Sequence, residues 1–436
     1  MNVNSAFYAP NYVSPYSLQM NVGIQRELAP GTVLSVDYIH SATLKIQQTV
    51  DVNHVGAARF LNVPAAQAAI AATLSDFGAT SIDEAISKGA VIEDFMGNGL
   101  DSGNNFLSGY PAALFGAPEA AFGGANPLVG EGLFNFPSGH AAYDALQVNL
   151  RHQKAHPFPG VESGNFEASY SFSRAQTTSK GSSDSFFTNY PWDYDAPTRY
   201  IGPSSLDALH QLSFGGSFLL KYGPRIGVAG HFRSANPSSL ALDNLAEDNI
   251  YQTDVDGDGS TGDLMPDNNP GSFMHSATPG NLKSKIAAYN SRYAGTLTPA
   301  SQALIGAGLF SARQLQELNA VQQPIYSGAS SIFANPMFKS LDASFSWPIR
   351  LRWLGEGRSL EPGIAMYNAA NFANWGGTTA TMVNTSNAGA DGSGAAGYVN
   401  GDNGFDFKNQ TRTQRGSGTF DVGGQRSTEW QLKFNF

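Results

Sequence analysis

The sequence contains no cysteine in its 436 residues, which excludes disulfide bonds and thiolate metal sites. The absence of cysteine does not exclude an exported protein, because a large β-barrel needs no disulfide bonds. Charged residues make up only 14% of the chain, well below the usual fraction of about a quarter. The formal net charge is −10 and no basic cluster occurs, so a nucleic-acid partner is not expected.

Long apolar runs and catalytic motifs are also missing. No segment approaches the roughly 18 consecutive apolar residues of a transmembrane helix. The first residues have no basic start, apolar core or small-residue cleavage site, so no signal peptide is predicted. The sequence has neither an H-E-x-x-H pair nor a G-x-S-x-G elbow. Its two G-x-G-x-x-G matches, at 257–262 and 392–397, lack a βαβ context. We therefore expect neither enzyme activity nor a nucleotide cofactor.

What the sequence does contain is a repeated alternation of apolar and polar residues. In Tyr16–Leu28 the apolar residues from Leu18 to Ile24 occupy every second position, and polar residues or glycine lie between them. Such alternation predicts β-strands with one apolar and one polar face. Nine strands are predicted in this way, at 16–28, 32–40, 143–153, 165–173, 210–220, 225–232, 340–347, 360–368 and 427–436.

The connections between these strands alternate between short and long without exception. Long connections are predicted at about 41–142, 175–208, 233–338 and 369–426. Bacterial outer-membrane barrels have this pattern, with short periplasmic turns, long extracellular loops and an even number of strands. The predicted fold class is therefore all-β: a transmembrane antiparallel β-barrel, present here as about nine strands of a larger barrel. Its long extracellular loops are expected to contain short helices.

The barrel prediction gives the two strand faces different surroundings, with lipid against the apolar face and a wet lumen against the polar face. Aromatic residues near the strand ends suit the interfacial girdles of a barrel: Tyr16, Tyr38, Tyr143, Trp347, Trp430 and Phe436. Four lumen charges either form salt bridges along the wall or line a substrate path: Arg151, Glu167, Glu429 and Lys433. The alternative is a soluble β-protein whose apolar face forms the core.

Two segments in the predicted loops have helical sequences. Residues 64–77 are rich in alanine, and residues 311–323 open with Ser311 and Gln314 at the spacing of a capping box. Both are expected to be short helices within the loops. They give no evidence of a separate domain.

The sequence DVDGDGSTGD, which spans residues 254–263, is the best candidate for a binding site. Asp254, Asp256 and Asp258 occupy positions 1, 3 and 5 of a calcium loop, with glycine at the sharp-turn position that follows. Carboxylate oxygens at this spacing can converge on one Ca²⁺. Position 12, where such loops carry a bidentate glutamate, is Met265. The segment is therefore either a calcium-stabilised extracellular loop or an acidic, glycine-rich turn in solvent.

Several of these stretches, in their order along the chain, resemble a known family. The stretches are PYSLQMNVGIQREL with the hairpin after it, YDALQVNLRH, LEPGIAMYNAANFANW and the terminal EWQLKFNF. Together they resemble the C-terminal part of the barrel of TonB-dependent outer-membrane receptors, especially the Oar-like branch. The resemblance covers the strands over nearly the whole length and is weakest in the two longest loops.

The resemblance implies a non-enzymatic receptor in the outer membrane of a Gram-negative cell. Such receptors carry a secretory signal, a TonB box, a plug domain and about twenty-two strands. We therefore expect residues 1–436 to be a single barrel portion of a longer receptor, without a plug domain. Contact with the TonB complex would go through N-terminal regions outside this sequence. An unidentified extracellular ligand would contact mainly the loops 41–142 and 233–338.

Two other functions stay open at this point. One is a passive porin-like or structural barrel in the outer membrane, which needs no energy coupling. The other is a soluble extracellular calcium-binding β-protein or adhesin. A barrel embedded in lipid needs detergent for extraction, whereas the soluble protein does not.

The last predicted strand is a candidate assembly signal. Trp430, Leu432, Phe434 and Phe436 share one face of it. A terminal aromatic residue after alternating apolar residues resembles the signal by which the barrel-assembly machinery of the outer membrane recognises its substrates. Alternatively, Phe436 is a girdle residue that anchors the strand at the interface. Both roles can be served by the same aromatic ring.

Overall fold

The computed structural model describes residues 7–10, 12–102, 119–180, 189–242, 250–325, 337–351, 353, 358–374, 381–382 and 424–436. Nine long strands lie at the nine predicted positions. They are β2 (Tyr16–Ala29), β3 (Thr32–Asp51), β4 (Leu133–Ala155), β5 (Val161–Thr177), β7 (His210–Leu220), β8 (Arg225–Arg233), β10 (Phe338–Ser346), β12 (Ser359–Tyr367) and β14 (Ser427–Asn435).

These strands form one antiparallel sheet in the order β2-β3-β4-β5-β7-β8-β10-β12-β14. Short strands extend it: β1 (Phe7–Tyr8) pairs with β4, β6 (Gly202–Pro203) with β5, and β11 (Ile349–Arg350) with β12. A separate parallel pair consists of β9 (Ala241–Leu242) and β13 (Thr381–Met382). The sheet is not closed, because within the described residues β2 pairs only with β3 and β14 only with β12.

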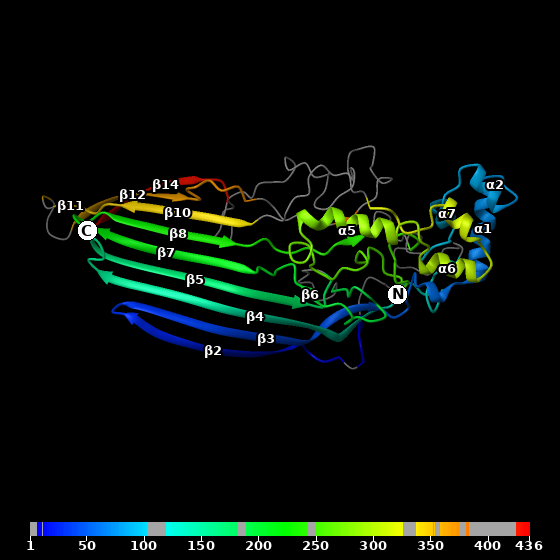
Figure 1. The fold of residues 1–436 in the computed structure, drawn as a ribbon, viewed down its shortest axis with the longest axis horizontal. Helices are drawn as coiled ribbons and strands as arrows, with labels where there is room; N and C mark the ends of the chain where they lie inside the picture. The colour runs from blue at the N-terminus through cyan, green and yellow to red at the C-terminus, as the bar shows by residue number, and fades with distance from the viewer. Residues whose placement is uncertain are drawn as a thin grey trace.

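The two ends of the sheet carry different connections (Figure 1). Residues 30–31, 156–160 and 221–224 make short turns at one end, where the C-terminus also lies. The helices and the described residues of the long loops lie at the other end. Gly31 in the first turn has φ +77°, and a Cβ atom there would lie 2.1 Å from the carbonyl oxygen of Gln153, so the turn requires glycine. The predicted alternation of short turns and long loops is confirmed.

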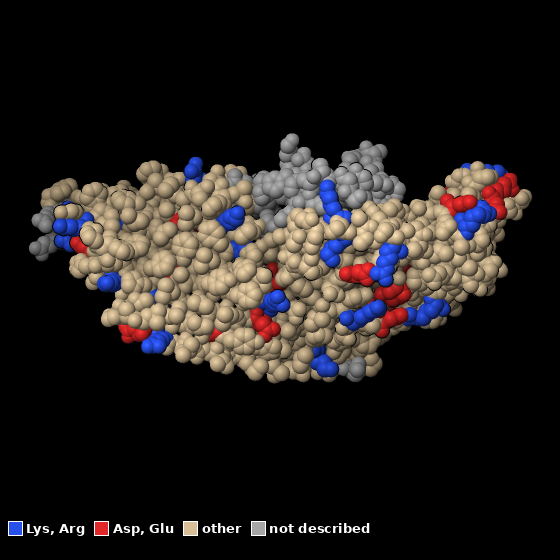
Figure 2. Space-filling model, viewed as in Figure 1, with Lys and Arg blue, Asp and Glu red and all other residues tan. Residues whose placement is uncertain are grey.

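The apolar faces of the strands are exposed to the surroundings. Val22 is 74% exposed, Ile24 70% and Trp430 79%. The large side chains that are fully buried all come from the loops, for example Phe122 and Tyr251. On the face in view, charged side chains are sparse over the strands and gather over the loops (Figure 2). The apolar strand faces therefore do not form the core that a soluble β-protein would need.

No helix in the described ranges is long and apolar enough to cross a membrane.

Three strands, β3, β4 and β5, are much longer than predicted, and the first two long loops are correspondingly shorter. β3 continues to residue 51 and β4 begins at residue 133, so the first long loop is 52–132 rather than 41–142. β5 continues to residue 177, so the second is 178–209 rather than 175–208. The other two long loops, 234–337 and 368–426, differ from the prediction by one residue at their ends.

The extra length of β3 could not be predicted from the sequence, because two register shifts and burial on both faces interrupt the alternating pattern. Its pairing with β4 shifts register on both sides of Ile46, next to Lys45 with its φ of +62°. Such bulges change which face each following residue occupies. Residues 47–51 are then buried on both faces, so the alternation of one apolar and one wet face is lost there.

Both predicted loop helices are present. They are α1 (Val63–Asp76) and α7 (Ala312–Glu317). The predicted capping box of α7 is confirmed: the Ser311 side chain accepts from the backbone N–H of Gln314, and the Gln314 side chain accepts from the backbone N–H of Ser311. α7 ends before residue 323, because Asn319 takes a left-handed φ of +65°. The loops also contain helices that were not predicted: the 3-10 helix η1 (Ala58–Phe60), α2 (Ile82–Ser87), α3 (Ile92–Gly97), α5 (Pro279–Arg292) and α6 (Pro299–Gly306).

The described residues of 52–132 and 234–337 fold together into one unit, here called the loop cap. One core contains Phe95 and Phe122 from the first loop and Tyr251 and Leu304 from the second. The hydroxyl of Tyr251 donates to the carbonyl oxygen of Leu100 at 2.8 Å, which ties the two loops together inside this core. A second core, which includes Phe273, Leu282 and Ile286, belongs to the second loop alone. The two longest loops are therefore packed against each other and are not independent segments.

Candidate functional site

The predicted calcium loop, residues 254–263, forms a tight turn within the loop cap. Asp254 accepts hydrogen bonds from the backbone N–H groups of Gly257 at 2.6 Å and Gly259 at 3.1 Å. Asp258 accepts one from the backbone N–H of Ser260 at 2.6 Å. These bonds fix the direction of the carboxylates while leaving further oxygen lone pairs available.

The structure brings the three predicted aspartates together and adds two more. One group of carboxylates consists of Asp254, Asp256 and Asp263, and a second consists of Asp193, Asp256 and Asp258. Within each group, one oxygen from each residue lies within 4.8 Å of the others. We refer to these five residues as the aspartate cluster.

The two added aspartates differ in how far the sequence could have revealed them. Asp263 lies in the same turn, two residues before Met265. The side chain of Met265 is buried in the second core of the loop cap. Asp193 comes from the loop 178–209, and no local sequence pattern connects it with the turn. Its neighbour Tyr194 donates a backbone hydrogen bond to Asp258.

The carboxylates of the aspartate cluster are crowded and mostly buried. Burial, reinforced by the negative charges of neighbouring aspartates, raises the pKa of Asp254 and Asp263 well above the ordinary range. Burial also raises the pKa of Asp258. Asp256 is exposed, but partial loss of hydration and the charges of Asp258 and Asp193 raise its pKa to about 7. The free cluster therefore resists carrying its full negative charge.

Two cations of the protein lie near the aspartate cluster. Lys180 donates to the carbonyl oxygen of Thr261 at 3.3 Å, and Arg199 forms an ion pair of 3.0 Å with Asp193. Burial lowers the pKa of Lys180, although the charge of Asp263 opposes this shift. Two cations offset only part of the charge of five carboxylates. The arrangement is suited to a hard divalent cation such as Ca²⁺, which prefers oxygen ligands.

The aspartate cluster lies where three loops meet. From the first loop, the backbone N–H of Ala58 donates to the carbonyl oxygen of Gly257 at 3.0 Å. A Cβ atom at Gly259, which has φ +96°, would lie 2.3 Å from the carbonyl oxygen of Val55, so glycine permits this close approach. The loop 178–209 contributes Asp193. A cation bound here would connect all three loops.

The predicted lumen charges lie on the polar face of the sheet. Arg151 and Glu167 form an exposed ion pair of 3.2 Å between neighbouring strands. Glu429 accepts a hydrogen bond from the hydroxyl of Tyr367 at 3.2 Å, and Lys433 lies opposite Glu361 in the register of β12 and β14. A hollow of about 640 Å³ extends along the wall beside Arg151 and Glu167. The Arg151–Glu167 ion pair and the hydrogen bond from Tyr367 to Glu429 favour the wall-bracing role for these three charges.

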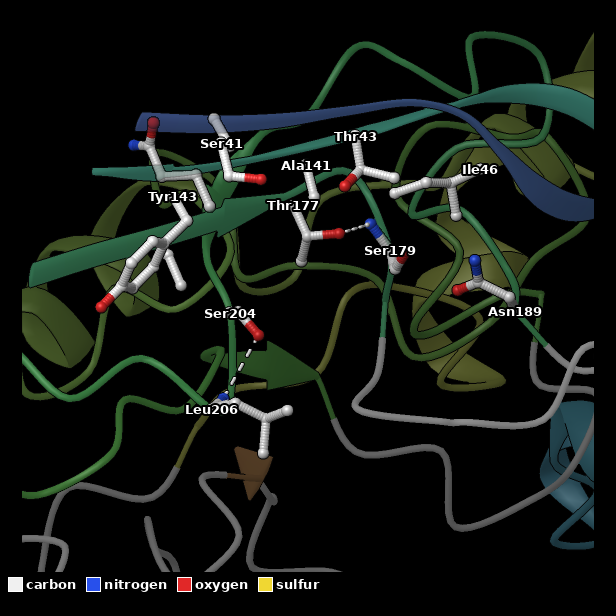
Figure 3. Close-up of a pocket in the computed structure, with 13 residues that line it drawn as sticks. Ser41, Thr43, Ile46, Ala141, Tyr143, Thr177, Ser179, Asn189, Ser204 and Leu206 are labelled. Carbon is white, nitrogen blue, oxygen red and sulfur yellow. Dashed lines mark hydrogen bonds between the residues drawn. The ribbon is translucent and has the colours of Figure 1, made fainter. Parts of the chain in front are cut away.

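A second hollow, of about 290 Å³, lies nearer the loop end of the same polar face (Figure 3). β3, β4 and β5 form its floor, and Ser179, Asn189, Ser204 and Leu206 of the loop 178–209 form a side of it. The lining residues are Ser41, Thr43, Ile46, Ala141, Ala142, Tyr143, Ala175, Gln176, Thr177, Ser179, Asn189, Ser204 and Leu206. None of them carries a charge, in contrast to the hollow beside Arg151. Tyr143 is in register with Ser41 and Ala175 on the polar face, so its prediction as a girdle residue is wrong. No local motif in the sequence identifies this site, because its residues come from three strands and the loop 178–209.

The four residues of the candidate assembly signal lie on β14 and just beyond it. Trp430 and Leu432 are 79% and 72% exposed, and the terminal Phe436 is 93% exposed. Phe434 and Phe436 pack edge to face, with their ring centroids 4.8 Å apart. β14 thus presents an apolar, aromatic face at the edge of the sheet.

The chain matches the outer membrane beta barrel domain family over residues 1–398. It belongs to that family, and it is a protein of the outer membrane. This result agrees with the exposed apolar strand faces, which are the lipid-contacting surface, and it excludes the soluble alternative. None of the curated proteins compared with the chain matches it.

Among solved structures, the outer membrane transporter YddB from Escherichia coli is similar to the chain, with a TM-score of 0.39 and 8% sequence identity. The similarity covers 92% of this chain and 33% of the transporter chain. The chain therefore spans about a third of the length of that transporter.

Proposed function

We propose that the chain forms the wall and extracellular loops of a TonB-dependent receptor of the Oar-like branch, which binds a ligand at its loops and takes it up. The observation that supports this function best is the loop cap. Its two loops share a core in which the ring centroids of Phe122 and Tyr251 lie 6.2 Å apart. The two loops therefore present a folded surface at the extracellular end. A passive or structural barrel has no need of such a folded surface.

We infer further that additional strands complete the wall, and that a plug domain and a TonB box belong to the complete receptor. The support is the pair of sheet edges at β2 and β14, which lack a second partner strand within the described residues. Unpaired backbone groups are too costly to face hydrocarbon. The barrel-assembly machinery and the TonB complex would then be the protein partners. Reading the DNA upstream of codon 1 tests this inference, and a plug-encoding sequence there is the expected result.

The receptor proposal is tested on the protein expressed from its complete gene. The purified periplasmic domain of TonB serves as bait for the detergent-solubilised receptor, and capture is expected. In lipid vesicles, the same protein is expected to block the passive entry of small sugars, because its lumen is plugged. Absence of capture together with free sugar entry would instead establish a passive, porin-like barrel.

We also propose that the aspartate cluster binds calcium and orders the loops. The support is the convergence of Asp263 and Asp193 on the three aspartates of the turn, which makes up for the missing glutamate at position 12. The direct measurement is a calorimetric titration of chelator-treated protein with Ca²⁺, with Mg²⁺ as the comparison. Binding of Ca²⁺ near a stoichiometry of one or two is expected, and no heat above dilution would refute the site.

A further inference from the structure

The uncharged hollow of Figure 3 is built from two cross-strand rows of side chains on the lumen face. The rows are Ser41, Tyr143 and Ala175, and then Thr43, Ala141 and Thr177. Small side chains occupy most of these positions on three adjacent strands, and the surface is hollowed as a result. The hollow of about 290 Å³ is near the lower end of the range of about 300–1,000 Å³ that is usual for ligand pockets.

The side wall of this hollow is held in place by hydrogen bonds. The side-chain amide of Asn189 donates to the carbonyl oxygen of Gln47 at 2.6 Å, and the backbone N–H of Thr49 donates to the carbonyl oxygen of Asn189 at 2.8 Å. The backbone N–H of Ser179 donates to the hydroxyl of Thr177 at 3.2 Å. Ser179 and Asn189 are thereby fixed against β5 and β3, so this side of the hollow is pre-formed.

The polar groups of the hollow are hydroxyls and amides without charge. The hydroxyls of Ser41 and Tyr143 make no hydrogen bond within the described residues, so each can donate to or accept from a ligand. A charged ligand would lose its hydration here without gaining a counter-charge. An apolar ligand would leave the hydroxyls without partners. The ring of Tyr143 adds a flat apolar surface beside its polar hydroxyl.

We propose that this hollow binds a neutral, hydroxyl-rich molecule, such as a sugar or the terminal sugar of an oligosaccharide. The inference rests on the proposed receptor function and names the chemical class of its ligand. The loop cap would then receive the ligand first, and the hollow would hold it at the top of the lumen wall.

The test uses the detergent-solubilised protein expressed from its complete gene, with glucose, maltose and N-acetylglucosamine as neutral probes and glucuronate and glucosamine as charged ones. Binding is followed by saturation-transfer NMR and quantified by calorimetry. Ala175→Leu fills the hollow and is expected to weaken binding of a neutral sugar at least tenfold. Tyr143→Phe removes one hydrogen-bonding group and is expected to weaken it about two- to tenfold.

Ala168→Leu is the matched control, because it adds the same group to the lipid-facing side of the same strand, and it is expected to leave binding unchanged. Unaltered binding in Ala175→Leu, preference for a charged probe, or no binding of any neutral probe would overturn the inference. These outcomes are separate from capture by TonB. If TonB captures the protein and no sugar binds, the receptor function stands and the hollow has no such ligand. If a neutral sugar binds and TonB does not capture the protein, only the receptor function is rejected.

Discussion

At the scale of single residues, the aspartate cluster is energetically unfavourable in the absence of a bound cation. Asp254, Asp258 and Asp263 are buried, and their negative charges repel one another. A buried carboxylate is tolerated when it is paired, protonated or bound to a metal. Lys180 and Arg199 offset part of the negative charge of the cluster. A bound cation would offset the remaining charge.

Calcium is therefore expected to stabilise the loop cap, by about 2.7 kcal/mol at a hundredfold excess over the dissociation constant. Asp263→Asn should lose most of this stabilisation, because it removes one anionic ligand while keeping a hydrogen-bond acceptor for the backbone N–H of Val255. Asp267→Asn is the matched control, since Asp267 pairs with Arg292 at 3.1 Å outside the cluster. The measurement is the melting temperature of the cap with calcium or chelator. An equal calcium response in Asp263→Asn would contradict the assignment.

At the scale of elements, each strand is expected to tolerate charge on one face only. Val148 of β4 lies in the apolar row with Val36 and Tyr170, and Gln147 beside it lies on the polar face. Val148→Arg should destabilise the folded wall by about 2–4 kcal/mol if it lies near the bilayer midplane, and Gln147→Arg by much less. The denaturant midpoint of the protein expressed from its complete gene and refolded into lipid vesicles measures both. Equal losses in the two variants would mean that the lipid-facing side is misassigned.

The terminal strand should show whether its last aromatic residue serves assembly, anchoring or both. Phe436→Ala is expected to lower the amount of protein in the outer membrane and its crosslinking to the barrel-assembly machinery. It should leave stability after refolding in vesicles nearly unchanged, because Phe436 lies just beyond the end of β14, outside its register with β12. Asn435→Ala, on the other face, is the control. A parallel loss of stability in vesicles would indicate anchoring instead of recognition.

The strands could be predicted from the sequence because each has one apolar and one polar face, which gives a local period of two. The strand prediction failed where a strand does not have one apolar and one polar face. Residues 47–51 of β3 are buried on both faces, and the bulge at Lys45 changes the phase of the pattern. Short helices such as α2 were missed for a related reason, since their burial depends on partners in a distant loop.

For the candidate site, too, only the residues that are close in sequence could be predicted. Asp254, Asp256 and Asp258 are close in sequence, and their spacing alone indicates that their carboxylates can meet. Asp193 joins them only because the loop 178–209 packs against the turn, and the sequence carries no signal for that contact. The uncharged hollow depends in the same way on the pairing of β3, β4 and β5.

At the scale of the whole molecule, the chain combines two parts that are stabilised in different solvents. The strand wall presents its apolar side chains to lipid, whereas the loop cap buries its own cores in water. Residues far apart in sequence, such as Leu100 and Tyr251, hold the cap together. The stability of the cap should therefore be separable from that of the wall.

Phe122→Ala tests this separation, because Phe122 is fully buried between the two loops and packs against Tyr251. A truncation of this kind typically costs about 3–5 kcal/mol, enough to open a marginally stable unit. Limited proteolysis should then cut both long loops, while the strand wall keeps its denaturant midpoint in vesicles. Ala168→Leu on the lipid face is the control and should leave the loops protected. If the wall is lost together with the cap in Phe122→Ala, the two parts fold as one cooperative unit.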